Sequence, residues 1–319
     1  MRRPSQEPLP YEELPLGPLD PERVEAMWCY RPGAPRRQTV LLDGRMDLVA
    51  HAVLDANGRI ATVRLAIAGP ADRPGTVAHR APVWSAGVRF QLGWGGACLA
   101  LDPAALLNQV MTGAAVERHL GALGDGLASA LLAATDTSAL QAALVQAAHR
   151  LSQRAGPPGP MQARALRALR WWRMHPGAPL QALCSALAVP ERTLRRDMLA
   201  TVGLPLRSLA GILRFHRAMA LVQMGQAPSL TGLAHDAGYA DQAHMTRQFR
   251  RLGGFTPAQP EAVPVVVEAA WQAPSAGPAP PGAHAETCAA GPHNLHPRRP
   301  APKAGSPAQS ARLPRAAGL

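Results

Sequence analysis

The sequence predicts a multi-domain chain: a small α+β N-terminal domain, an all-α C-terminal domain with two helix-turn-helix units joined by a long helix, and a disordered C-terminal tail. Three observations predict this fold class. Strand-like apolar runs fill residues 38–101, one helical apolar spacing occurs twice in residues 161–260, and Ala, Pro and Gly dominate afterwards. A chain of 319 residues has room for one to three such domains.

Changes in composition divide the chain into five segments. Residues 1–35 are rich in Pro and Glu and are expected to be an irregular lead-in. Residues 36–151 form the α+β domain, a candidate regulatory or sensor domain, and "SQRAGPPGP" (152–160) is a linker by composition. Residues 161–260 form the helical domain. Residues 261–319 cannot bury enough apolar surface to offset the entropy of ordering, so we expect disorder there.

The α+β domain begins with strand-like runs. "TVLLDGRMDLVAHAVLD" is apolar and broken by the turn signal Asp43-Gly44, and "ATVRLAIAG" alternates apolar with smaller or polar residues. "VWSAGVRFQLGWGGACLAL" reads as another strand, loosened by its glycines. Helical spacing starts at Pro103, and 115–151 reads as two helices separated near Thr135-Asp136-Thr137.

The second helical unit lies in "SLTGLAHDAGYADQAHMTRQFRRLGGFTP". Ser229 is a plausible N-cap, and the apolar positions i, i+3, i+4 and i+7 fall on Leu230, Leu233, Ala234 and Ala237. Gly238 supplies the left-handed residue that ends this helix, and Asp241 can cap the next one. That second helix has a buried stripe of Met245, Phe249 and Leu252 behind a polar front.

A looser copy of this unit lies about fifty residues earlier, in "PLQALCSALAVPERTLRRDMLATVG". The same apolar spacing falls on Leu180, Leu183, Cys184 and Leu187, and Pro190 precedes the second helix. Leu194 and Met198 are expected to point inward, and the outward face carries Arg192, Arg195 and Arg196.

Between the two units, residues 205–225 lack an internal proline and repeat apolar residues at helical spacing. About 18 residues of helix span roughly 27 Å. Because one turn of DNA is ~34 Å long, this helix can hold two readers over successive major grooves on one face of the duplex.

The positive charge lies mainly in the helical segment. The chain has a net charge of +12, and residues 160–259 hold 13 arginines against four acids, a net +9. This indicates a polyanionic partner.

Four scattered cysteines without a CxxC pair favour free thiols in a reducing compartment. Because neither a signal peptide nor an apolar run of ~18 residues is present, we expect a cytoplasmic protein without a membrane partner.

Residues 161–259 resemble the DNA-binding domain of the AraC/XylS family of bacterial transcription regulators. The motifs that carry the resemblance are "LQALCSALAVPERTLRRDM", "LRFHRAMALV" and, most specifically, "LTGLAHDAGYADQAHMTRQFRRLGGFTP". The resemblance implies that base edges or phosphates are contacted by Arg192, Arg195, Arg196, Gln242, His244, Thr246, Arg247 and Arg250. Arg214, Arg250 and Arg251 suit phosphate contact or structural pairing. Pro190, where the family usually has a hydroxyl cap, departs from the pattern.

This resemblance implies a transcription regulator and no enzyme, inserting two recognition helices in successive major grooves as an activator modulated through its N-terminal domain. Its partners would be promoter or operator DNA and RNA polymerase, with a small-molecule effector and a second copy of the chain as further candidates. The alternatives are a constitutive DNA binder or repressor without effector, and a DNA-repair enzyme fused to the same module. The repair enzyme would need a nucleophilic Pro-Cys-His or clustered cysteines, which the sequence lacks.

Residues 38–120 more weakly resemble an uncharacterised domain found before this module. "VLLDGRMDLVAH" matches its Pro-Asp-Gly-x-x-Asp-Leu signature with Leu42 in place of proline, and Leu92 replaces a second proline. A candidate effector pocket is formed by Asp43, Arg45, Asp47 and Arg89; the alternative is a hairpin turn with ordinary ion pairs. We expect no cofactor and no metal, since the spacing of His and Cys near the C-terminus fits no zinc pattern.

Overall fold

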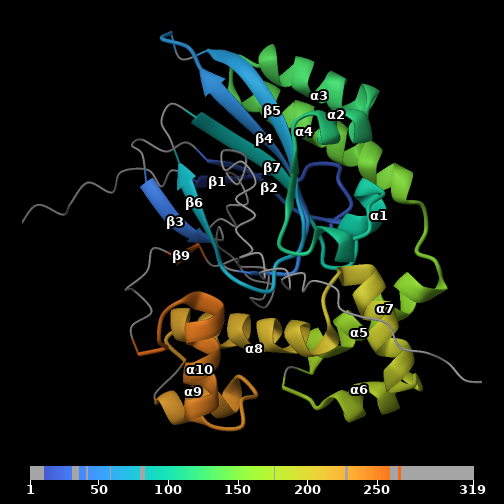
Figure 1. Ribbon diagram of the computed structural model, residues 1–319, viewed down its shortest axis with the longest axis vertical. Helices are drawn as coiled ribbons and strands as arrows, with labels where there is room; N and C mark the ends of the chain where they lie inside the picture. The colour runs from blue at the N-terminus through green and yellow to red at the C-terminus, as the bar shows by residue number, and fades with distance from the viewer. Residues whose placement is uncertain are drawn as a thin grey trace, which may run out of the picture. The chain divides into compact units, whose positions relative to one another are not determined.

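The computed structural model describes residues 11–30, 36–40, 42–57, 59–79, 83–175, 177–226, 229–258 and 265–266 (Figure 1). Its strands are β1 (Tyr11–Leu14), β2 (Val24–Tyr30), β3 (Arg36–Val40), β4 (Asp47–Leu54), β5 (Ile60–Ala68), β6 (Gly75–His79), β7 (Val83–Phe90), β8 (Val110–Thr112) and β9 (Val265–Val266). Its helices are α1 (Gly95–Leu99), the 3-10 turn η1 (Ala104–Leu106), α2 (Ala114–Leu120), α3 (Ala122–Leu132), α4 (Thr137–Ala155), α5 (Pro160–Met174), α6 (Leu180–Leu187), α7 (Glu191–Val202), α8 (Leu206–Gln223), α9 (Leu230–Asp236) and α10 (Gln242–Gly253).

The N-terminal domain is built on a six-stranded antiparallel sheet in the order β1-β2-β7-β4-β5-β8. The expectation of an irregular lead-in over 1–35 is therefore wrong for β1 and β2. β2 pairs with β7, with Trp28 opposite Gly87, and six of its seven residues are buried. Local Pro and Glu content favours irregular chain, but pairing with a distant strand outweighs that preference.

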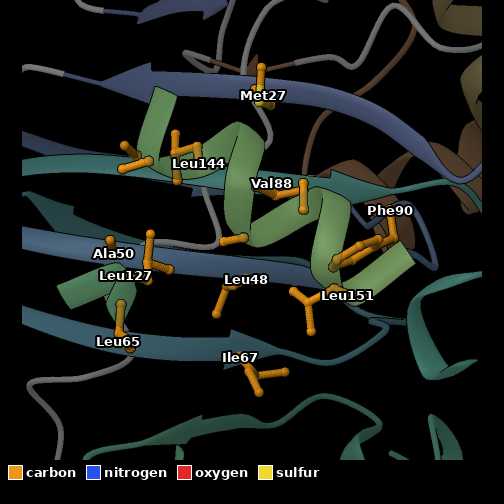
Figure 2. Packing of buried hydrophobic residues seen from close by; sticks show 14 of the residues in the cluster. Met27, Leu48, Ala50, Leu65, Ile67, Val88, Phe90, Leu127, Leu144 and Leu151 are labelled. Atoms are coloured by element: carbon orange, nitrogen blue, oxygen red, sulfur yellow. The ribbon is translucent and has the colours of Figure 1, made fainter. Parts of the chain in front are cut away.

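One face of this sheet packs against α3 and α4 (Figure 2). Leu48, Ile67 and Val88 from the strands meet Leu127 of α3 and Leu144 of α4, all at most 4% exposed. Alternate residues of the strands therefore form a single apolar layer under the helices. On the sheet's opposite face a smaller buried cluster is formed by Trp28, Tyr30, Val49 and Ala66.

The helices of this domain differ in three places from the sequence prediction. The expected break near Asp136 is confirmed, and its side chain caps α4 by accepting from Ala139 N at 2.8 Å. A second break at Gly121 makes three helices instead of two. The stretch 83–101 that reads as one strand is a strand over β7, as predicted, but residues 95–99 fold into α1, because a short apolar run rich in Gly and Ala does not distinguish the two structures. The predicted linker 152–160 is helical up to Ala155, so only four residues join α4 to α5.

A smaller sheet has the order β6-β3-β9. Because β3 and β4 belong to different sheets, the expectation that Asp43-Gly44 is a hairpin turn is wrong; it is a crossing between sheets. β9 lies in the segment 261–319 that is expected to be disordered, and it pairs in parallel with β3 through Thr39 and Val265. The rest of that segment lies outside the described residues.

The C-terminal region is all α, as predicted, and α5 to α10 share one hydrophobic core. Its fully buried members include Leu194 and Met198 of α7, and Phe215 of α8. Two residues of the first domain, Leu42 and Leu92, also lie in this core. In the described part of the chain no single helix is long and apolar enough to cross a membrane; α7 and α8 reach that threshold only together, across a 69° bend.

Candidate nucleic-acid interface

The first unit consists of α6 and α7. α6 ends at Ala188, whose φ of +51° closes the helix, and Pro190 precedes α7 without any side-chain cap bond. The inward positions of α7 are buried, with Leu194 and Met198 at 0% exposure, as the apolar spacing predicts. The outward face carries exposed Arg192, Arg195 and Arg196.

Acidic neighbours hold two of these arginines. Arg195 Nε donates to Glu191 Oε1 at 2.7 Å, one helical turn away. Arg196 Nη2 lies 3.2 Å from Asp197 Oδ1. The fully buried Asp197 also accepts from Arg164 Nε at 2.7 Å, so this carboxylate fixes α7 against α5. The exposed Arg195–Glu191 pair can open to meet a polyanion, since surface ion pairs contribute little to stability.

The second unit, α9 and α10, has the caps that the sequence predicts. Ser229 Oγ accepts from Gly232 N at 3.0 Å, and Asp241 Oδ1 accepts from His244 N at 2.6 Å. Gly238 has a φ of +82°, the left-handed conformation of the turn. Behind the polar front, α10 buries its predicted stripe of Met245, Phe249 and Leu252, each 0% exposed.

The front of α10 presents hydrogen-bonding groups. Gln242, Arg247 and Arg250 are exposed, while His244 and Thr246 are half-buried. Thr231 of α9 donates to Gln242 Oε1 at 3.2 Å, which orients the amide. The residue types and their exposure suit contact with base edges and phosphates.

His244 packs edge-on against Tyr239, with ring centroids 5.4 Å apart. Burial lowers the pKa of His244, and the positive charges of Arg214 and Arg247 lower it further. The imidazole is therefore neutral at pH 7 and offers one donor and one acceptor. Arg214, on α8, stands over the Tyr239 ring at 5.9 Å, so this end of the interface is strongly cationic.

Helix α8 confirms the predicted rod between the units. It is 18 residues long, which corresponds to roughly 27 Å. The second unit is attached to it through aromatic packing, with the Phe215 and Phe249 rings 4.8 Å apart. The chain therefore presents two basic helices from one continuous support (Figure 1).

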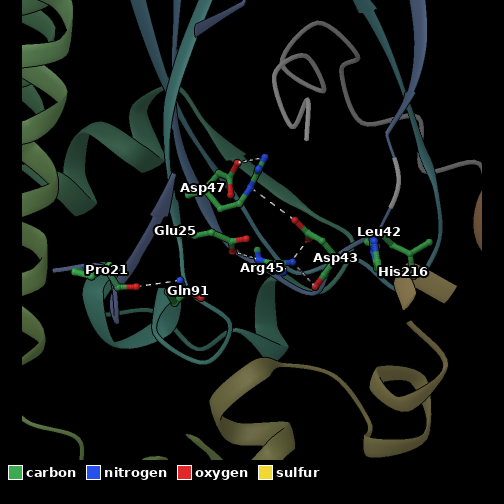
Figure 3. A network of polar contacts seen from close by, with 9 residues as sticks. Pro21, Glu25, Leu42, Asp43, Arg45, Asp47, Gln91 and His216 are labelled. Atoms are coloured by element: carbon green, nitrogen blue, oxygen red, sulfur yellow. Dashed lines mark hydrogen bonds and ion pairs between the residues drawn. The ribbon is translucent and has the colours of Figure 1, made fainter. Parts of the chain in front are cut away.

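The four residues of the candidate effector pocket come together, but they form ion pairs with one another and with Glu25 (Figure 3). Arg89 lies 3.3 Å from Asp47 Oδ2 and 3.8 Å from Asp43 Oδ2, and Arg45 pairs with Glu25. All four are at most 3% exposed. Sequence reasoning missed Glu25, whose carboxyl pKa is raised by burial. Its only sequence signal was a lone acid in an apolar run.

A groove of about 590 Å³ lies elsewhere, between residues 93–104 and helices α5 and α7. Its lining is mostly apolar and includes Ala97, Leu101, Pro103, Met161 and Leu199, together with Arg196. Both domains line it, and its volume is in the range of small-molecule sites.

Residues 183–260 match a family described as a helix-turn-helix domain. No curated protein matches the chain. Among solved structures, ToxT of Vibrio cholerae is similar in its apo form at 9% identity and a TM-score of 0.39, covering 73% of this chain and 95% of that one. A second ToxT structure is 10% identical to this chain with a TM-score of 0.36, and the match covers 71% of this chain and 95% of that one. A structure of ToxT with a bound unsaturated fatty acid is 10% identical with a TM-score of 0.35, and the match covers 72% of this chain and 95% of that one. At these TM-scores the likeness does not bear on fold or function.

Proposed function

We propose that this chain, which carries an AraC-type helix-turn-helix domain in its C-terminal half, is a sequence-specific DNA-binding transcription regulator. In this proposal α7 and α10 enter successive major grooves of one duplex. The observation that carries it is the pair of helices with fully buried apolar backs and basic fronts, attached to one 18-residue rod.

The N-terminal domain would bias DNA binding, and the protein would act as an activator in contact with RNA polymerase. Support for the bias comes from Leu42 and Leu92, which belong to the first domain and lie in the helical core. A small molecule in the 590 Å³ groove would touch both that domain and α7. It would change DNA affinity only if it bound the competent and incompetent states with different free energies.

A constitutive binder or repressor without an effector is the second candidate. It is favoured by the mutual pairing of Asp43, Arg45, Asp47 and Arg89 with Glu25. A reporter behind the bound promoter separates the candidates: deletion of the gene lowers transcription for an activator and raises it for a repressor.

The DNA-binding test uses the full chain and a duplex enriched from a random pool. At about 0.15 M salt we expect the enriched duplex to bind at least ~10³-fold more tightly than a scrambled one. Equal affinity for both, or no enrichment at all, would show that the function is wrong.

A further inference from the structure

The loop that enters the first helix-turn-helix unit touches the turn of the second unit at a pair of glycines. Gly177 lies in the loop between α5 and α6, and Gly238 is the turn residue between α9 and α10. A Cβ on Gly238 would lie 2.5 Å from the Cα of Gly177, closer than real Cβ contacts. A Cβ on Gly177 would lie 3.2 Å from the Cα of Gly238. The two main chains thus approach as closely as glycine permits.

Both glycines also have left-handed backbones, with φ of +84° and +82°. Helix α8 closes on the same point, since the Cδ of Arg214 lies 3.7 Å from the Cβ position of Gly238. The loop before α6, the turn of the second unit and α8 therefore meet at one place.

Both units pack against α8 in the shared core, and the glycine contact adds a direct connection between the loop before α6 and the turn of the second unit. With this contact, α5, α8 and the turn between α9 and α10 are connected in a closed loop. Packed contacts of this kind resist twisting of the two units about the axis of α8. Separation and rotation of α7 relative to α10 are then set by this contact as well as by the rod.

We propose that Gly177 and Gly238 determine operator spacing: they lock the two reading units so that the protein accepts one separation of its half-sites. This rests on the proposed DNA-binding function. One inserted base pair moves a half-site by ~3.4 Å and rotates it by roughly 34°, which a locked pair cannot follow.

The test measures affinity of the full chain for the enriched duplex and for duplexes with one or two base pairs inserted between the half-sites. Wild type is expected to lose at least about tenfold per insertion. Gly177→Asn tolerates the left-handed backbone but adds a Cβ at the contact, and the loss is expected to fall to about twofold. Gly225→Asn is the matched control: its φ is +66° and nothing lies within 4 Å of its Cβ position.

The inference would be overturned if the wild type bound the duplexes with insertions as tightly as the enriched duplex. It would also be overturned if folded Gly177→Asn lost as much affinity per insertion as the wild type. If Gly177→Asn lowers the unfolding midpoint below that of Gly225→Asn, Gly177→Ala repeats the test with the Cβ alone. Enrichment of a duplex together with either negative result leaves the proposed function standing and removes only the glycine lock.

Discussion

The main-chain oxygen of Leu42 accepts a hydrogen bond from Nε2 of His216 at 2.6 Å, joining the first domain to the rod helix α8 (Figure 3). Both residues are 1% exposed. The side chain of Leu42 lies in the helical core. The segment around Leu42 therefore connects the N-terminal domain to the helix that joins the two helix-turn-helix units.

The burial of His216 predicts a pH dependence of stability. Burial lowers the pKa of His216 to about 4, while the bond to Leu42 raises it to a lesser extent. In the unfolded chain a histidine has a pKa of about 6.5, so the unfolded state takes up the proton first. The contribution of neutral His216 to the free energy of unfolding is fully present above pH ~6.5 and is lost as the pH falls towards about 4. The loss amounts to roughly 3 kcal/mol.

Urea unfolding between pH 7 and pH 4 measures this loss. His216→Gln keeps an N–H donor and does not titrate, so the free energy of unfolding of the variant is expected to fall less steeply with pH. Parallel curves for the two proteins would contradict the assignment.

Gly44→Ala should loosen the same segment. Gly44 has a φ of +72°, and a Cβ there would lie 2.8 Å from Cδ1 of Leu204. We expect a loss of about 1–3 kcal/mol in unfolding free energy. Gly17→Ala shares the left-handed backbone but meets nothing within 4 Å, so it reports the backbone cost alone. Equal losses from the two substitutions would mean that the contact with Leu204 contributes nothing.

The exposed arginines should separate into two classes. Arg195→Ala and Arg247→Ala are each expected to cost about 1–3 kcal/mol on the enriched duplex and less on random DNA, because they lie on the reading fronts. Arg250→Ala should weaken binding similarly on both, as a phosphate contact does. Competition assays with both duplexes decide it; uniform losses from all three would refute these roles.

Helix capping gives a matched pair of variants. Asp241 caps α10 and Asp136 caps α4, with bonds of 2.6 Å and 2.8 Å. Removing either side chain by alanine substitution should cost about 1 kcal/mol of stability. Only Asp241→Ala is expected to weaken DNA binding, since α4 lies in the other domain. If Asp136→Ala weakened DNA binding as much, the effect would reflect stability and not the interface.

Most of the structure of the helical region could be predicted from its sequence alone. The apolar spacing, the caps at Ser229 and Asp241 and the left-handed Gly238 act over one or two helical turns, so they can be recognised locally. The same holds for the exposed arginines of α7, which lie opposite its buried residues.

Tertiary structure alone decided the connections. Strand β2 forms by pairing with β7, about sixty residues later in the chain. The Pro and Glu content of residues 1–35 therefore could not predict it. The bond between Leu42 and His216 joins residues 174 positions apart, and the Gly177–Gly238 contact joins the loop before α6 to the turn between α9 and α10. Such contacts form only when the whole chain packs, because a local pattern carries no information about which distant residue will face it.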